Sequence, residues 1–240
     1  MTVVKQLVAR TVVDVVRSRP YFIFVVSSMA DGTLYDVVVV GAGVSGVAAA
    51  HYLLNAGVPR NSIAILEKGA RPGGTWFYNT YPGAACDVPS HFYSFSFALN
   101  PNWSRAWAPQ AEILEYLEQV TAAECGDLVH LNTSVTSTVW DERARIWVIS
   151  THHADGTSGV VRARYVVAGP GALATPSTPD FPGKANFVGR STHTATWDHS
   201  LKLDGLRIGV IGTGCSGACR ARDDGDPSWF AAKLPWTHDV

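Results

Sequence analysis

The sequence has few cysteines and no recognisable metal motif. Only four of its 240 residues are cysteine, Cys86, Cys125, Cys215 and Cys219, and none of them forms a Cys-x-x-Cys pair. This number is too small for a disulfide-stapled fold, and the spacing does not fit a zinc site. We therefore expect free thiols, no bound metal and a reducing, cytoplasmic compartment.

Net charge and long apolar runs are also scarce. The formal net charge is −1 and 16% of the residues are charged, which gives no basic surface for nucleic acid or for an anionic membrane. The most apolar early stretch, residues 21–26, is far shorter than the roughly 20 residues that a helix needs to cross a bilayer. We expect a globular protein with neither nucleic-acid partner nor stable membrane insertion; its oligomeric state stays open.

Residues 1–34 read as an N-terminal extension. Residues 1–28 contain four basic residues and a single acid, Asp14, which is compatible with a targeting segment. They are also compatible with an over-extended start, because Met29 would be a natural beginning for the fold that follows. We favour the second interpretation.

A strand, a glycine-rich turn and a helix follow one another directly after this extension. Residues 35–40, YDVVVV, form a β-branched apolar run typical of a strand buried on both faces. GAGVSG, residues 41–46, comes next, then a run of helix-forming residues that ends at Gly57. A second apolar run, residues 63–66, ends in Glu67. This unit predicts a Rossmann-like dinucleotide site.

Each part of the unit has a chemical reason. Gly41 permits the tight turn, Gly43 lets backbone N–H groups approach a pyrophosphate, and Gly46 lets helix and strand pack closely. The helix N-terminus places partial positive charge at the phosphates. Glu67 would accept hydrogen bonds from ribose hydroxyls.

Two further segments carry more specific patterns. GGTWFYNTYPGAACD, residues 73–87, has neither helical nor strand periodicity, and we expect an ordered loop with a turn at Pro82 and Gly83. FVGRSTHTATWD, residues 187–198, spaces Phe187, Gly189, His193, Trp197 and Asp198 at fixed intervals.

These segments resemble the two fingerprints of Baeyer–Villiger monooxygenases, a family of class B flavin-dependent monooxygenases. The first, [A/G]GxWxxxx[F/Y]P[G/M]xxxD, is matched by Gly73, Gly74, Trp76, Tyr81, Pro82, Gly83 and Asp87, and residues 187–198 match the second, FxGxxxHxxxW[P/D]. The resemblance covers about residues 35–217. It implies an α/β fold: a Rossmann-like FAD-binding domain, built of a parallel sheet plus a β-meander, followed by the start of a second Rossmann-like domain that binds NADPH.

The resemblance also implies roles for individual residues. Asp87 would orient the active-site arginine, while His193 and Trp197 would couple the two domains. The FAD-binding residues would be Gly41, Gly43, Ser45, Gly46, Glu67, Gly74, Thr75, Trp76, Asp87 and Tyr93, with the backbone near Val135 at the adenine. The NADPH-binding residues would be Gly212, Thr213, Gly214, Ser216 and Gly217.

The domain boundaries follow from composition. We expect an incomplete FAD-binding domain at residues 35–180, with a helix over 110–120, a strand meander after it and a hairpin turn at 154–156. A linker is expected at 181–204 and the start of the NADPH-binding domain at 205–240.

The end of the sequence departs from the family pattern. A strand is expected over 206–211, but after Gly217 a helix-breaking Asp-Gly-Pro cluster replaces the apolar helix, and no further strand is expected. This tail resembles a shifted reading frame or a misplaced splice. No arginine of the sequence matches the family's active-site motif.

The function implied is NADPH- and O2-dependent oxygenation of a ketone to an ester or lactone, with the 240-residue chain itself inactive. Two alternatives stay open: an N- or S-oxygenating flavin monooxygenase, against which Trp197 and the motif of residues 73–87 argue, and a non-catalytic remnant that binds FAD or another nucleotide. The sequence does not identify the ketone.

Overall fold

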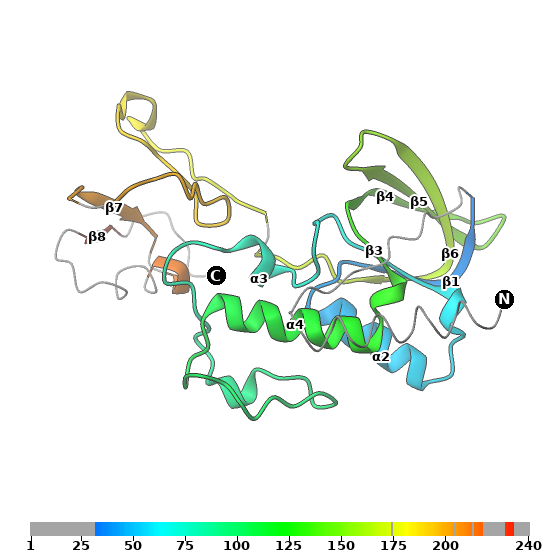
Figure 1. Cartoon of the computed structure of the whole chain (residues 1–240). Coiled ribbons are helices and arrows are strands. Elements are labelled where there is room, and N and C mark those ends of the chain that lie inside the picture. The colour runs from blue at the N-terminus through cyan, green and yellow to red at the C-terminus, as the bar shows by residue number, and fades with distance from the viewer. Residues whose placement is uncertain (1–31, 174, 204, 213, 218–228, 233–240) are drawn as a thin grey trace.

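A computed structural model describes residues 32–173, 175–203, 205–212, 214–217 and 229–232. Within them the chain forms a six-stranded sheet with the strand order β3-β2-β1-β6-β5-β4 and a separate two-stranded sheet (Figure 1). The strands of the large sheet are β1 Leu34–Val40, β2 Ile63–Leu66, β3 Val129–His130, β4 Thr133–Asp141, β5 Ile146–His153 and β6 Ser158–Ala168.

The large sheet has a parallel half and an antiparallel half. β1 lies between β2 and β6 and pairs with both in parallel, and β2 also pairs with β3 in parallel. β4, β5 and β6 follow one another as an antiparallel meander, with a register shift between Val135 and Ser137. The predicted combination of a parallel sheet and a β-meander is therefore confirmed.

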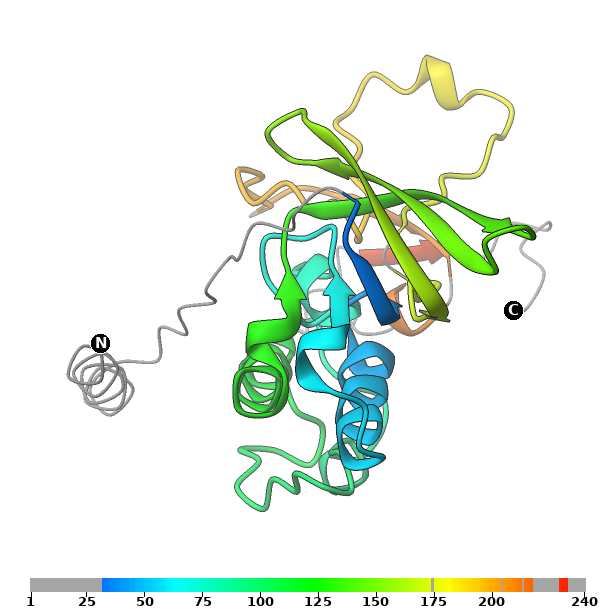
Figure 2. The ribbon, with the colours of Figure 1, turned by 90° about the vertical axis from the view of Figure 1, so that its right-hand side faces the viewer.

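Two helices pack side by side on one face of the parallel strands (Figure 2). α2, Val44–Asn55, ends next to Gly57, which has φ +87°, as the sequence predicts. α4, Gln110–Glu124, continues past the expected end at residue 120. The shorter helical segments are η1 Arg60–Ser62, α3 Thr75–Tyr78, η2 Ser90–Phe92, η3 Gly126–Leu128 and η4 Lys184–Asn186.

The hydrophobic core lies on both faces of β1. Val37 and Val39 belong to the cluster formed with α2 and α4, whereas Val38 belongs to a second cluster that contains Ile149 and Val161 of the meander. Alternate residues of a strand point to opposite faces, so both faces of β1 are covered. This explains why residues 37–40 are apolar in succession instead of alternating.

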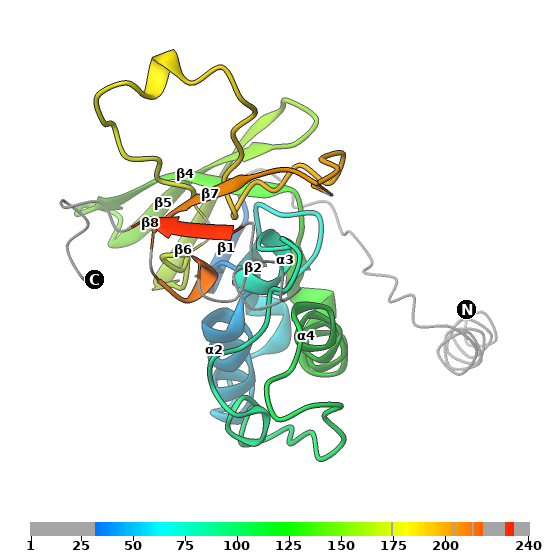
Figure 3. The same ribbon diagram turned by 90° about the vertical axis from the view of Figure 1, so that its left-hand side faces the viewer.

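The two-stranded sheet lies apart from the large one in Figure 1, and Figure 3 views the molecule from the side on which β7 and β8 lie. It pairs β7, Ile208–Ile211, in parallel with β8, Trp229–Ala232. The expectation that no strand follows Gly217 is therefore wrong. A short run of aromatic and small residues forms a strand here because it pairs with β7. β7 also starts later than the predicted residue 206, because a turn bond from the Leu206 N–H to the Leu203 carbonyl oxygen (3.1 Å) precedes it.

No helix of the described residues is long and apolar enough to cross a membrane.

Candidate functional site

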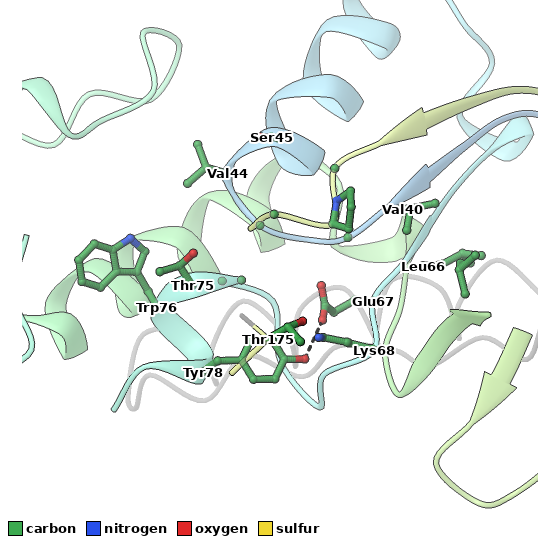
Figure 4. A pocket seen from close by; sticks show the side chains of 18 of the residues that line it. Val40, Val44, Ser45, Leu66, Glu67, Lys68, Thr75, Trp76, Tyr78 and Thr175 are labelled. Carbon is green, nitrogen blue, oxygen red and sulfur yellow. Dashed lines mark hydrogen bonds between the residues drawn. The ribbon is translucent and has the colours of Figure 1, made fainter. Parts of the chain in front are cut away.

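A cavity of about 460 Å³ lies where the parallel strands end (Figure 4). Carboxyl ends of parallel strands are the usual place for a ligand in an open α/β sheet. Its lining residues come from the ends of β1, β2 and β6, from the first turn of α2, from the loop around α3 and from the start of β4. They are Val40, Gly41, Gly43, Val44, Ser45, Leu66, Glu67, Lys68, Gly73, Gly74, Thr75, Trp76, Tyr78, Tyr93, Thr133, Ser134, Val135, Gly169, Pro170, Gly171 and Thr175.

The turn at residues 41–46 has the geometry that its glycines predict. Gly41 has φ +95°, a conformation that favours glycine, and its N–H donates to the Leu66 carbonyl oxygen at 2.8 Å. A Cβ on Gly46 would lie only 1.8 Å from the carbonyl oxygen of Gly41. Gly46 does not line the cavity; it allows α2 to start directly behind the turn.

The N-terminus of α2 opens into the cavity. Gly43 is its N-cap and supplies no side-chain hydrogen bond, and the first turn contains no acidic residue. Val44 and Ser45 are exposed and line the cavity. Backbone N–H groups at such an end lack partners inside the helix, so this end can bind an anion.

The segment after Gly73 packs directly on this turn. The N–H of Gly73 donates to the Ala42 carbonyl oxygen at 3.0 Å, and a Cβ on Gly74 would lie 3.0 Å from the Cα of Gly43. The prediction of a loop is wrong over Thr75–Tyr78, because these residues form the single helical turn α3. One turn is too short to leave a periodic signal in the sequence.

Glu67 is buried at the end of β2 and is already hydrogen-bonded. Its side chain accepts from the Ala42 N–H through Oε2 and from the Gly69 N–H through Oε1, both at 2.7 Å. The hydroxyl of Tyr78 donates to the same Oε1 at 3.2 Å (Figure 4). Burial, and then the charge of Glu67, raise the pKa of Tyr78 far above its usual value. The carboxylate is therefore held rigidly at the cavity edge.

An aromatic pair lines another part of the cavity. The indole N–H of Trp76 donates to the hydroxyl oxygen of Tyr93 at 2.8 Å, and the rings meet edge-on with centroids 5.7 Å apart. Burial raises the pKa of Tyr93. A wall of this kind offers apolar faces to a flat ligand while keeping its polar atoms hydrogen-bonded.

The cavity gathers most of the predicted FAD-binding residues. Those that line it are Gly41, Gly43, Ser45, Glu67, Gly74, Thr75, Trp76, Tyr93 and Val135. Asp87 does not line it: its exposed carboxylate accepts a hydrogen bond from the Cys215 thiol at 2.9 Å. This contact joins residues 73–87 to the second glycine turn.

The predicted linker residues also lie outside the cavity. His193 and Trp197 are half-buried, and Nδ1 of His193 accepts from the Ala195 N–H at 3.0 Å. The expected linker touches the segment of residues 73–87 through His199, whose Nε2 lies 2.8 Å from Oγ1 of Thr80.

The second glycine turn repeats the first. Gly212 has φ +117°, and a Cβ on Gly217 would lie 2.6 Å from the carbonyl oxygen of Gly212. Gly214 is exposed and Ser216 is half-buried, while residues 215–217 have helical backbone. Thr213 lies outside the described residues.

Sequence reasoning missed several lining residues, chiefly Lys68, Tyr78 and residues 169–171. The signal for the last was present, because the Gly-Pro-Gly run directly follows an apolar strand. Gly169 lies against Gly41: a Cβ on Gly41 would lie 2.5 Å from the Gly169 carbonyl oxygen. Tyr78 had no such signal, because its position depends on the path of the loop around α3.

Comparison with known proteins gives first the class of domain. A family model described as an NAD(P)-binding Rossmann-like domain matches residues 39–109, which contain the first glycine turn and Glu67. The described strands, turn and helix agree with that class.

Individual relatives give a more specific similarity. A Baeyer-Villiger monooxygenase of Pseudomonas aeruginosa is 44% identical over 181 residues, which are 75% of this chain and 33% of the relative. A phenazine N-monooxygenase of Lysobacter antibioticus is 35% identical over 78% of this chain and 34% of its own length. The crystal structure of cyclohexanone monooxygenase from Rhodococcus sp. Phi1 bound to NADP+ is similar with a TM-score of 0.67 and 39% identity, covering 78% of this chain and 35% of that one.

Over about three quarters of its length the chain is homologous to Baeyer–Villiger monooxygenases, and its structure is similar to that of cyclohexanone monooxygenases. It spans about a third of the length of these relatives.

Proposed function

We propose that the cavity binds FAD. The N-terminus of α2 would hold the diphosphate, Glu67 the adenosine ribose, and the backbone near Val135 the adenine. The observation that carries this proposal is Gly43. A Cβ there would meet the protein only at 3.5 Å, from the Cα of Gly74, so packing does not require glycine. What glycine keeps open at this position is the space above the helix N-terminus, where a phosphate would lie.

The other residues that the sequence predicts to bind a cofactor have proposed roles relative to this site. Gly41, Ser45, Gly46, Gly74 and Thr75 would shape the diphosphate cradle, and Trp76 and Tyr93 would form its aromatic wall. Residues 35–180 would be the FAD-binding domain, 181–204 the linker with His193 and Trp197, and 205–240 the start of an NADPH-binding domain. Gly212, Thr213, Gly214, Ser216 and Gly217 would hold NADPH there.

The reaction we propose is the family's conversion of a small-molecule ketone to an ester or lactone with NADPH and O2, which the 240-residue chain does not complete by itself. FAD, when bound, supplies the redox chemistry: it accepts a hydride from NADPH and passes electrons to O2. The protein binds and orients the cofactor and excludes water. Asp87 would position an active-site arginine, for which this sequence has no matching residue.

N-oxygenation is the second candidate, because one relative is a phenazine N-monooxygenase. Trp197 favours the ketone reaction, since enzymes that oxidise nitrogen or sulfur usually have Tyr or Phe at this position of the linker fingerprint. A non-catalytic FAD-binding chain is the third candidate.

Reconstitution with FAD tests the proposal. The 240-residue chain would be mixed with FAD and freed of unbound cofactor by gel filtration. We expect an equimolar amount of FAD to stay with the protein and to be released on denaturation. Protein that is folded by circular dichroism but elutes without flavin would contradict the proposal.

Substrate-stimulated NADPH consumption separates the three candidates. We expect the FAD-loaded chain to consume no more NADPH when cyclohexanone is added, because the matching arginine is missing. Stimulation by cyclohexanone would show that the chain is a ketone oxygenase by itself. Stimulation by a phenazine alone would favour N-oxygenation.

We propose a cytoplasmic location on the state of the described cysteines. Cys86 and Cys125 are buried and Cys215 is exposed, and no disulfide joins these three described cysteines to one another. Burial raises the pKa of Cys125 to about 12, so its thiol stays protonated and unreactive at neutral pH. Thiol titration of the denatured, unreduced protein should find every cysteine free.

A further inference from the structure

Tyr78 contributes a polar group to the cavity beyond the glycine turn. It is the last residue of α3, and its side chain extends towards the end of β2, where its hydroxyl meets Glu67 (Figure 4). The ammonium group of Lys68 lies 4.9 Å from the centre of its ring, a cation–π contact that helps to hold the ring in place. All three side chains line the cavity.

The hydrogen bonds of Glu67 leave the two carboxylate oxygens unequal. A carboxylate oxygen offers about two acceptor positions. Oε1 uses both, for the Gly69 N–H and for the Tyr78 hydroxyl. Within the described residues Oε2 accepts from one donor, the Ala42 N–H, and so keeps one position for a further donor. Tyr78 therefore fixes which oxygen stays available.

The hydroxyl of Tyr78 can only act as a donor to Glu67. Burial and the nearby carboxylate raise its pKa, so the hydroxyl stays protonated at neutral pH. Its position is also confined, because a Cβ on Gly69 would lie 2.8 Å from the Tyr78 hydroxyl oxygen. Residue 69 must therefore be small for the Tyr78 hydroxyl to reach the Glu67 carboxylate.

We propose that Tyr78 is a positioning residue for nucleotide recognition: its hydroxyl holds Glu67 so that Oε2 accepts a hydrogen bond from a ribose hydroxyl. The inference rests on the proposed FAD site and deepens it. Tyr78 would thereby set the preference of the cavity for a nucleotide with an intact ribose over one that lacks the ribose hydroxyls.

Calorimetric titration with two probes tests the inference without any turnover. The probes are ADP, which is the adenosine diphosphate half of FAD, and 2′,3′-dideoxyadenosine diphosphate. The proteins are the 240-residue chain and its Tyr78→Phe variant, which loses only the hydroxyl. Tyr52→Phe is the matched control, since Tyr52 is an exposed residue of α2 whose hydroxyl meets Ser96 at 3.4 Å, away from the cavity lining.

We expect the unaltered chain to bind ADP about tenfold more tightly than the dideoxy probe, as one hydrogen bond to a charged group allows. Tyr78→Phe should weaken ADP about three- to tenfold and the dideoxy probe less than twofold. Tyr52→Phe should change neither affinity. Thermal unfolding of each variant checks that the fold is retained.

The remaining outcomes each decide something. If the unaltered chain binds neither probe, the proposed FAD site fails together with the inference. If it binds ADP and Tyr78→Phe weakens both probes equally, Tyr78 supports the fold only and the inference alone fails. Tighter ADP binding by Tyr78→Phe would mean that the tyrosine competes with the ribose for Glu67, which also overturns it.

Discussion

The turn at residues 41–46 and the turn at residues 212–217 begin with the same backbone conformation but lie in different surroundings. In both turns the first glycine has a positive φ. A Cβ on the last glycine would lie very close to the carbonyl oxygen of the first glycine, at 1.8 Å for Gly46 and 2.6 Å for Gly217. The strand before the first turn has three consecutive buried residues. The strand before the second, β7, has no buried residue, and its Ile211 is 51% exposed.

The difference shows which properties the glycine pattern itself confers. It confers the local turn, which appears in both places. Burial, an acid at the end of the neighbouring strand and a segment packed over the turn come from other parts of the chain, and the described residues provide them only for the first turn, through Glu67 and residues 73–78. Within the described residues, we therefore place the flavin site at the first turn, which lines the cavity.

The largest expected effect separates the two turns by stability. Gly46→Ala should lower the free energy of unfolding by about 3 kcal/mol, because its Cβ would clash with backbone that two core clusters hold in place. Gly217→Ala should cost at most about 1 kcal/mol, because the contact is looser and β7 is half-exposed. Urea denaturation measures both. Equal losses would show that the second turn is as firmly packed as the first.

The next effect concerns binding. Gly43→Ala should weaken FAD binding about tenfold, because the added methyl group would occupy the space above the helix N-terminus. Its free energy of unfolding should change by less than about 1 kcal/mol, since Gly43 has φ −84° and room for a Cβ. Gly209→Ala in β7, where a Cβ meets nothing within 4 Å, is the matched control and should bind FAD normally. Unchanged FAD binding by Gly43→Ala would remove the main support for the site.

A smaller effect depends on pH and concerns the first region only. Arg60, before β2, donates from Nε to Asp127, before β3, at 2.8 Å, and this hydrogen bond lowers the pKa of Asp127. The stabilisation of the fold by this ion pair is therefore complete above the pKa of Asp127 in the unfolded chain, about 3.9. It is lost as the pH falls through the lower pKa of Asp127 in the folded chain.

Because both side chains of this pair are about half exposed, the contribution should stay below about 1 kcal/mol. Asp127→Asn should lower stability at neutral pH and flatten its decline in acid, which denaturation at several pH values would record. An acid limb as steep as that of the unaltered chain would exclude this pair as its source.

The smallest effect concerns the contact of Thr80 with His199 in the proposed linker. Thr80→Val removes the hydrogen bond to His199 at the surface, so the free energy of unfolding should change by no more than about 0.5 kcal/mol. Residues 181–204, the proposed linker, should nevertheless be cleaved faster in limited proteolysis followed by mass spectrometry. Cleavage at the same rate would mean that other contacts hold the linker.

The sequence predicted those elements whose signals are local. The apolar run of β1, the glycine turn, α2 with Gly57 and the strand ending in Glu67 are continuous in sequence, so composition and spacing located them. α3 and β8 were missed, because one turn and one short strand have no periodicity and depend on partners elsewhere in the chain. The hydrogen bond between Tyr78 and Glu67 joins α3 to the end of β2, and only the path of the backbone brings the two residues together.

Hydrogen–deuterium exchange of the chain with and without FAD tests the central claim most directly, because it compares the two turns in one experiment. We predict that FAD slows amide exchange at residues 41–47 and 73–78 and leaves residues 208–217 unchanged. Protection confined to residues 208–217, or no protection in either turn at saturating FAD, would contradict the assignment of the flavin to the first turn.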